Sequence, residues 1–205
     1  MPIDPSDLGR SYDAVIRVNS QSGKGGIAYL LESSYGIELP RRFQIELARH
    51  VQALTDTTGA EVNAHEVWEV FERNYLPKSG VERVQLTAYE VVESGSGSAP
   101  HSRVNVLVDG VEQVSTHAGV GPVESLTSAL SRHGFDIKIL TLHQTSIGYG
   151  NDSLALTLLE VRVPQGVRWV AGSASSVLSA TLEAVIRAAN TIALQESALH
   201  LAAIG

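Results

Sequence analysis

The sequence GVGPVESL at residues 119–126 decides the expected fold, because it combines a glycine turn with the start of a helix. Pro122 suits the first position of a helix, since the N–H that proline lacks would be unpaired there in any case. Val123, Leu126 and Leu130 then fall on one face at helical spacing. The backbone N–H groups of such a helix start, together with the helix dipole, can bind a carboxylate or a phosphate.

A second stretch near the C-terminus repeats this pattern. A shift of 56 positions superimposes a glycine turn, a strand and a helical stripe, in the pairs Gly110/Gly166, Val114/Val170, Leu126/Leu182, Ala129/Val185 and Leu130/Ile186. We therefore expect two βββα units, at about 81–134 and 135–197. Two such units can pair their sheets and lay both helices on one side, which buries the apolar stripes.

Alternation and turn residues predict the elements of each unit. The expected strands are 84–92, 103–108, 111–116, 135–143, 154–163 and 167–171, and the expected helices are 122–133 and 176–190. Asp109-Gly110 is a hairpin turn signal. Residues 191–205 can prolong the last helix.

The first 76 residues predict a smaller subdomain. Strands at 13–18 and 27–31 would form a β-hairpin around a glycine-rich turn, and a helix begins at Pro40. Asn63 and Glu66 form a plausible capping box for a second helix. The expected class is therefore α+β, with a hairpin and two helices at 1–76, a linker at 77–80, and a tandem βββα domain at 81–205.

Composition excludes several classes of function. The formal net charge of -7 argues against a general nucleic-acid binder, which needs a basic face to displace counterions. The absence of cysteine excludes disulfides and thiolate metal sites. No apolar run approaches the roughly 20 residues of a membrane span, and the start lacks the pattern of a signal peptide. We therefore expect a cytoplasmic protein without a membrane partner.

The sequence SGKGG at residues 22–26 invites comparison with a phosphate-binding loop through Lys24. It lacks the required spacing of glycine, four residues, then Gly-Lys-Ser/Thr. It is also expected to join two strands, whereas a phosphate-binding loop leads from a strand into a helix. A hairpin tip is therefore the preferred interpretation over nucleotide binding.

The seven histidines show no spacing typical of metal ligands, and we predict no catalytic residue in this chain. They are His50, His65, His101, His117, His133, His143 and His200.

Two stretches, DAVIRVNSQSGKGGIAY at 13–29 and LPRRFQIE at 39–46, resemble the start of the second linker subdomain of actinobacterial 2-isopropylmalate synthases. Residues 81–190 resemble the leucine-sensing regulatory domain of the same enzymes, which is a pair of βββα units. GVGPV at 119–123 stands where that family has a glycine–polar–glycine–proline turn, and GFD at 134–136 matches the strand opening after the helix.

The resemblance implies a non-catalytic regulatory part that binds leucine for feedback inhibition, forms a homodimer and has a catalytic barrel as its partner. That TIM barrel, which uses a divalent metal to condense acetyl-CoA with 2-oxoisovalerate, is missing from these residues, so no cofactor is expected here. The resemblance implies the leucine-binding residues Gly119, Val120, Gly121, Pro122, Val123, Ile139, Leu142, Ser146, Ser153 and Val177.

Three departures from the family pattern concern this pocket. Val120 replaces the usual polar residue, Leu142 replaces a tyrosine, and Glu124 replaces a small residue. Each lost hydrogen bond to a charged group costs roughly 1.5–3 kcal/mol. The alternatives are therefore a leucine site of reduced affinity, a sensor of another small amino acid, and a ligand-free dimerisation module.

Overall fold

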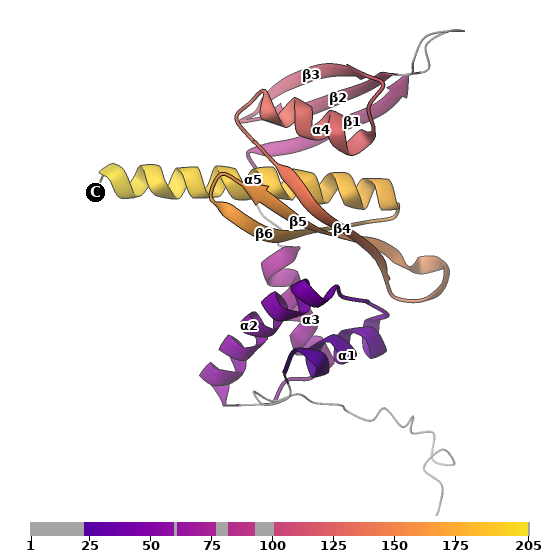
Figure 1. The fold of residues 1–205 in the computed structure, drawn as a ribbon, viewed down its shortest axis with the longest axis vertical. Helices are drawn as coiled ribbons and strands as arrows, with labels where there is room; N and C mark the ends of the chain where they lie inside the picture. Colours follow the sequence, from indigo (N-terminus) through magenta and orange to yellow (C-terminus); the bar gives the residue numbers. More distant parts are fainter. Residues whose placement is uncertain (1–22, 60, 77–81, 93–100, 205) are drawn as a thin grey trace, which may run out of the picture. The chain divides into compact units, whose positions relative to one another are not determined.

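The computed structural model describes residues 23–59, 61–76, 82–92 and 101–204. Within these residues the chain combines five α-helices with six β-strands in two three-stranded antiparallel sheets. This arrangement confirms the α+β class. The chain divides into two compact units, Met1–Phe71 and Glu72–Gly205. Figure 1 shows the elements of both units.

Three helices form the described part of the N-terminal region. They are α1 (Gly23–Tyr35), α2 (Arg41–Thr58) and α3 (Ala64–Tyr75), and the division between the two units falls within α3. Phe43 on α2 meets Phe71 on α3 edge to face, with ring centroids 5.8 Å apart. Aromatic packing of this kind contributes to the small core of this unit.

The expected strand at residues 27–31 is wrong, because these residues lie in α1. Ile27, Leu30 and Leu31 are buried, and their i, i+3, i+4 spacing is that of one helix face. A short apolar run does not distinguish a strand from a buried helix by periodicity alone. The expected partner strand at 13–18 lies outside the described residues. A helix therefore stands where the second strand of the predicted β-hairpin was expected.

The ends of the other two helices confirm their predicted signals. Phe43, Leu47 and Val51 are buried on one face of α2, and Gly59, at φ 65°, ends that helix by donating its N–H to the Thr55 carbonyl. The predicted capping box is present at the start of α3. The Asn63 N–H donates to the Glu66 carboxylate at 2.8 Å, and the Glu66 N–H donates to Asn63 Oδ1 at 3.0 Å.

The second unit contains the two predicted βββα repeats in chain order. The first is β1 (Val84–Val92), β2 (His101–Val108), β3 (Val111–Ala118) and α4 (Pro122–Ser131). The second is β4 (Lys138–Ile147), β5 (Leu154–Val163), β6 (Gly166–Ala174) and α5 (Val177–Ile204). The sheets have the orders β1-β2-β3 and β4-β5-β6. Residues 191–204 continue α5, an extension that the sequence allowed.

The two repeats are related by a shift of 55 positions in their hairpins, not the expected 56. Val108 pairs with Val111 across the first turn, and Val163 pairs with Gly166 across the second. The helices also start 55 positions apart, at Pro122 and Val177. The expected equivalences are therefore each wrong by one position: Gly110/Gly166, Val114/Val170, Leu126/Leu182, Ala129/Val185 and Leu130/Ile186. Burial agrees in the strands, since Val114 is 59% exposed and Val170 only 4%.

The first strand of each repeat carries a β-bulge at an equivalent position. The register shifts between Leu86 and Ala88 in β1 and between Ile139 and Thr141 in β4, a separation of 53 positions. A bulge adds a residue to one strand and changes the direction of the side chains beyond it. This repeated irregularity shapes the lining of both pockets described below.

Helices α4 and α5 contribute to one core in the second unit. Leu126 and Leu130 from α4 and Val185 and Ile192 from α5 are buried together with Val104 and other valines and leucines of the sheets. Leu126, Leu130 and Val185 belong to the helical stripes that the sequence predicted, and Ile192 extends the second stripe. The core therefore joins the two repeats into one compact unit.

Helix α5 is apolar because it is a core helix. Over Val177–Gln195 it is long and apolar enough to cross a membrane by length and composition alone. However, more than half of this stretch is buried within the protein, and Val185, Ala188 and Ile192 belong to the core. Packing against the sheets accounts for its composition.

Candidate functional site

A pocket of about 550 Å³ lies where the start of α4 meets the start of β4. Its lining consists of Gly121, Pro122, Val123, Glu124 and Thr127 from the helix and Ile137, Lys138 and Ile139 from the segment entering the strand. We call it the α4 pocket. Its volume lies within the range of small-molecule sites.

The glycine turn gives α4 an open N-terminus. Gly119 has a φ of 71°, a conformation that glycine adopts without strain, and Gly121 occupies the N-cap in an extended conformation. Pro122 is the first helical residue, as predicted. No side chain in the described part of the chain caps this helix. The first-turn N–H groups of a helix have no partner within it, so those of Val123 and Glu124 can receive an anionic group.

The α4 pocket also carries one charge of each sign. Glu124 lies in the first turn of α4, and Lys138 is the first residue of β4. The apolar part of the lining comes from Val123, Ile137 and Ile139. A molecule with a carboxylate, an ammonium group and a short apolar side chain matches this set of groups.

The structure brings together only part of the predicted leucine-binding set. Gly121, Pro122, Val123 and Ile139 line the α4 pocket, and Gly119 and Val120 belong to the turn that precedes it. Leu142, Ser146, Ser153 and Val177 do not line it. Leu142 is 44% exposed and Val177, at the start of α5, is 50% exposed.

The bulge in β4 explains why Ile139 and Leu142 share a face although they are three residues apart. Ile139 pairs with Val161 and Leu142 pairs with Leu159, and both partners are in the core beneath the helices. Residues paired across an antiparallel ladder point to the same side of the sheet. Strict alternation in the sequence would have placed Ile139 and Leu142 on opposite faces.

Three residues of the α4 pocket were not predicted. Thr127 lies one helical turn after Val123, so helical spacing could have revealed it. Ile137 and Lys138 come from the segment that returns toward the start of α4, which no local pattern indicates.

The described histidines, aspartates and glutamates include no group of three that could hold a metal ion. His117 is buried and lies outside the α4 pocket, with its Nε2 3.0 Å from Ser115 Oγ. Burial and the nearby Arg132 charge lower the pKa of His117. On Asp109, hydrogen bonding to Arg83 lowers the pKa of the carboxyl.

Lys24 lies on α1, which begins at Gly23, so the expectation that residues 22–26 form a turn between two strands is wrong. The spacing argument against a phosphate-binding loop is unaffected, because it depends on the sequence alone.

Comparison with known protein families gives matches in both the N-terminal and the C-terminal part of the chain. The family model described as the LeuA allosteric (dimerisation) domain matches residues 61–193. A model described as alpha-isopropylmalate synthase, post-catalytic domain-like, matches residues 1–32.

Curated relatives described as 2-isopropylmalate synthase include proteins from Parafrankia sp. (strain EAN1pec), 44% identical over 191 residues, and Arthrobacter sp. (strain FB24), 41% identical over 194 residues. A third, from Mycobacterium leprae (strain TN), is 38% identical over 191 residues. Each match covers 93% of this chain but only 34%, 33% and 31% of the respective relative. The chain thus spans about a third of the length of these relatives.

Proposed function

Because the chain belongs to the LeuA allosteric (dimerisation) domain family, we propose that its α4 pocket binds leucine and that this binding inhibits a 2-isopropylmalate synthase of which the chain is the regulatory part. 2-Isopropylmalate synthase belongs to the leucine-biosynthesis pathway, of which leucine is the end product. The proposal is therefore one of feedback inhibition.

The observation that carries this proposal is the open start of α4 beside an apolar pocket with one acidic and one basic residue. A leucine carboxylate would accept hydrogen bonds from the first-turn N–H groups, with Lys138 nearby. The ammonium group would face Glu124. The isobutyl side chain would lie against Val123, Ile137 and Ile139.

Regulation requires that leucine bind two states of the protein with different affinity. We propose that these are states of a homodimer, since the family description names dimerisation. The catalytic barrel, with its divalent metal and acetyl-CoA, would lie in the part of the relatives that the chain does not span. The described residues include no cluster of three His, Asp or Glu side chains that could hold a metal ion, so they do not fit a site for that divalent metal. As a biosynthetic regulator, the protein would work in the cytoplasm.

Isothermal titration of the chain with leucine, isoleucine and valine tests the proposal. We expect leucine to bind and to raise the melting temperature. Glu124→Gln should weaken leucine binding about tenfold or more, because the ammonium group loses its ionic partner. Glu112→Gln, on the exposed side of β3 and outside the pocket, is the matched control. Absence of both heat and thermal stabilisation at millimolar leucine would contradict leucine binding by this chain.

A ligand-free dimerisation module is the second candidate. It is favoured by the position of Leu142, Ser146, Ser153 and Val177 outside the α4 pocket, and by the apolar Val120 in the turn. In that case, light scattering would give a dimer mass that no amino acid changes, and all three titrations would give no heat. If isoleucine or valine bound more tightly than leucine, the chain would be a sensor of that amino acid.

A further inference from the structure

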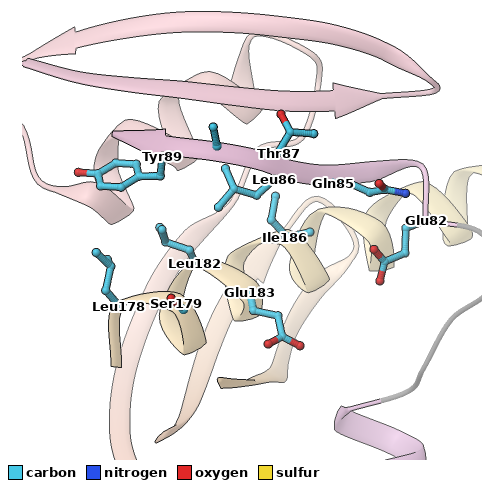
Figure 2. A pocket seen from close by; sticks show the side chains of 11 residues that line it. Glu82, Gln85, Leu86, Thr87, Tyr89, Leu178, Ser179, Leu182, Glu183 and Ile186 are labelled. Atoms are coloured by element: carbon cyan, nitrogen blue, oxygen red, sulfur yellow. The ribbon is translucent and has the colours of Figure 1, made fainter. Parts of the chain in front are cut away.

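A second pocket of about 550 Å³ lies between β1 and the first half of α5. Figure 2 shows Leu86 from the strand and Leu182 and Ile186 from the helix pointing toward one another across it, with Tyr89 toward one end and Glu82 toward the other. We call it the β1–α5 pocket. β1 lies at an edge of the sheet formed by the described strands, and Asn190 on α5 is hydrogen-bonded to the backbone of Val84 at its start.

The internal repeat relates this pocket to the α4 pocket position by position. The two helices start 55 positions apart, at Pro122 and Val177. The same shift pairs Val123 with Leu178, Glu124 with Ser179, and Thr127 with Leu182, and the bulge shift of 53 pairs Lys138 with Gln85 and Ile139 with Leu86. All ten residues line their respective pockets. Each pocket thus lies between the first strand of one repeat and the helix of the other.

The equivalent positions differ in charge. Ser179 stands where the α4 pocket has Glu124, and Gln85 stands where it has Lys138. Both charged residues that would hold a zwitterion are therefore replaced by neutral ones. The apolar character is retained and extended, because Leu182 stands where the α4 pocket has Thr127.

The helix start also differs. The Ser176 hydroxyl accepts a hydrogen bond from the Ser179 N–H at 3.0 Å, so the side chain of Ser176, the residue before α5, caps that helix. α4 has glycine at the cap and an open start. A ligand carboxylate therefore has no comparable anion site at the start of α5.

The charged residues that line the β1–α5 pocket are acidic. Glu82 and Glu183 are part of the lining, and none of the described lining residues is basic. The Glu183 carboxylate points away from β1 (Figure 2), where the Ser173 N–H donates to it at 3.2 Å and Arg187 forms an ion pair with it. The Tyr89 ring contributes an aromatic surface, while its hydroxyl is bonded to Ser102 at 3.1 Å. Because Glu183 is engaged by Arg187, the preference for charge rests on Glu82 and on the Tyr89 ring, and a carboxylate and an aromatic ring both favour a cationic group over an anionic one.

We propose that the β1–α5 pocket is a second small-molecule site, which binds an apolar amine without a carboxylate group. The proposal does not depend on leucine binding to the α4 pocket. The two pockets would descend from one repeated architecture and select ligands by charge: a zwitterion at the open helix start and an amine at the capped one.

The test uses the whole chain and three probes that share an isobutyl group: 3-methylbutylamine, leucine and 4-methylpentanoate. In amide NMR spectra, we expect the amine to shift signals of β1 and the first half of α5, and 4-methylpentanoate to leave them unchanged. Shifts confined to other residues, or equal shifts from the amine and the acid, would overturn the proposal.

Filling the pocket provides the second arm of the test. Leu178→Trp places a large ring at a lining position that is 41% exposed, and should reduce the affinity for 3-methylbutylamine at least tenfold. Leu194→Trp, on the same helix at a position 64% exposed and outside the pocket, should leave it unchanged. If Leu178→Trp does not fold, Leu86→Trp enlarges a side chain that points into the pocket from the strand side (Figure 2).

Two results would contradict the proposal even with folded variants. One is an amine affinity that the filling substitutions leave unchanged. The other is a Leu178→Trp protein that changes from dimer to monomer in light scattering, because this would assign the pocket to contact between copies. The leucine affinity of the same variants should equal that of the parent chain. A result against the β1–α5 pocket can therefore be distinguished from a result against leucine binding in the α4 pocket.

Discussion

The side chain of Asn190 on α5 bridges the backbone of Val84 at the start of β1. Its amide donates to the Val84 carbonyl at 2.7 Å, and its Oδ1 accepts from the Val84 N–H at 2.9 Å. The two residues are 106 positions apart. Asn190 thus pairs with an edge strand as a neighbouring strand would, and it connects the helix of the second repeat to the first strand of the first.

Asn190→Ala should therefore destabilise the protein. Val84 is fully buried, so the substitution leaves a backbone donor and an acceptor without partners. Each unpaired group costs about 1–3 kcal/mol. Urea unfolding followed by circular dichroism should show a lower midpoint at an unchanged slope. Asn151→Ala, at an exposed position, is the control; an equal loss in the two variants would contradict the bridging role.

Gly172→Ala should also be destabilising, for a steric reason. Gly172 lies in β6 beneath α5, and an added Cβ would overlap the Ala180 carbonyl oxygen and lie 2.5 Å from the Ala184 N. Both neighbours are helix backbone, which cannot move aside as a flexible side chain would, so we expect a loss of at least about 1–3 kcal/mol.

The comparison for this substitution is Gly121→Ala, where an added Cβ meets nothing within 4 Å. That change should cost less than about 1 kcal/mol, since only the preference at a helix cap is altered. Thermal unfolding of the two variants checks the difference. Similar melting temperatures would show that α5 can move away from β6.

Gly121→Val should weaken leucine binding without unfolding the protein. The φ of Gly121 is -73°, which a valine adopts, and there is space for its Cβ. The side chain would obstruct the approach of a carboxylate to the first-turn N–H groups, so we expect at least a tenfold loss of affinity, about 1.4 kcal/mol. Calorimetry measures this loss, with Thr116→Val on β3 as a control. Unchanged affinity would show that the ligand does not use the open helix start.

The stability of the second unit should fall in mildly acidic solution because of His117. Its pKa is lowered in the folded protein, first by burial and then by Arg132. The unfolded chain therefore binds a proton at a higher pH than the folded one does. Stability should decrease as the pH falls below the ordinary histidine value of 6.5 toward the lowered value, and be fully present above 6.5.

His117→Gln should flatten this dependence, because glutamine does not titrate in this range. Arg132→Gln should reduce it in part, since burial remains the larger cause. Urea midpoints measured between pH 5 and pH 8 check both expectations. His133→Gln, at an exposed neighbouring position, serves as the control and should retain the dependence of the parent chain.

The helix ends and turns of this fold were predictable because their causes are local. Gly59 ends α2, and the Asn63–Glu66 pair begins α3, within four residues of the atoms that they satisfy. Asp109-Gly110 closes the first hairpin with positive φ values of 49° and 81°. The sequence could not distinguish α1 from a strand, because the five residues 27–31 present a short apolar run in either conformation.

From local sequence pattern alone, the candidate site was predictable only on its helical side, and Ile139 on the opposite wall was expected from the family resemblance. GVGPV at 119–123 indicated an open helix start, and the structure has one at α4. The opposite wall depends on how β4 returns to that helix and on its bulge. Alternation alone could not show that Ile139 and Leu142 share a face, or that Lys138 lines the same pocket as Glu124.

By itself the sequence determined the βββα order, the glycine turn that begins α4 and most helix ends, since these follow from dihedral preferences and hydrogen bonds between near neighbours. Only the tertiary structure decided that α1 is a helix, that the hairpins repeat at 55 positions, and that two equivalent pockets differ in their helix caps and charges. These features depend on contacts between residues as distant as Val84 and Asn190, and no local pattern records such contacts.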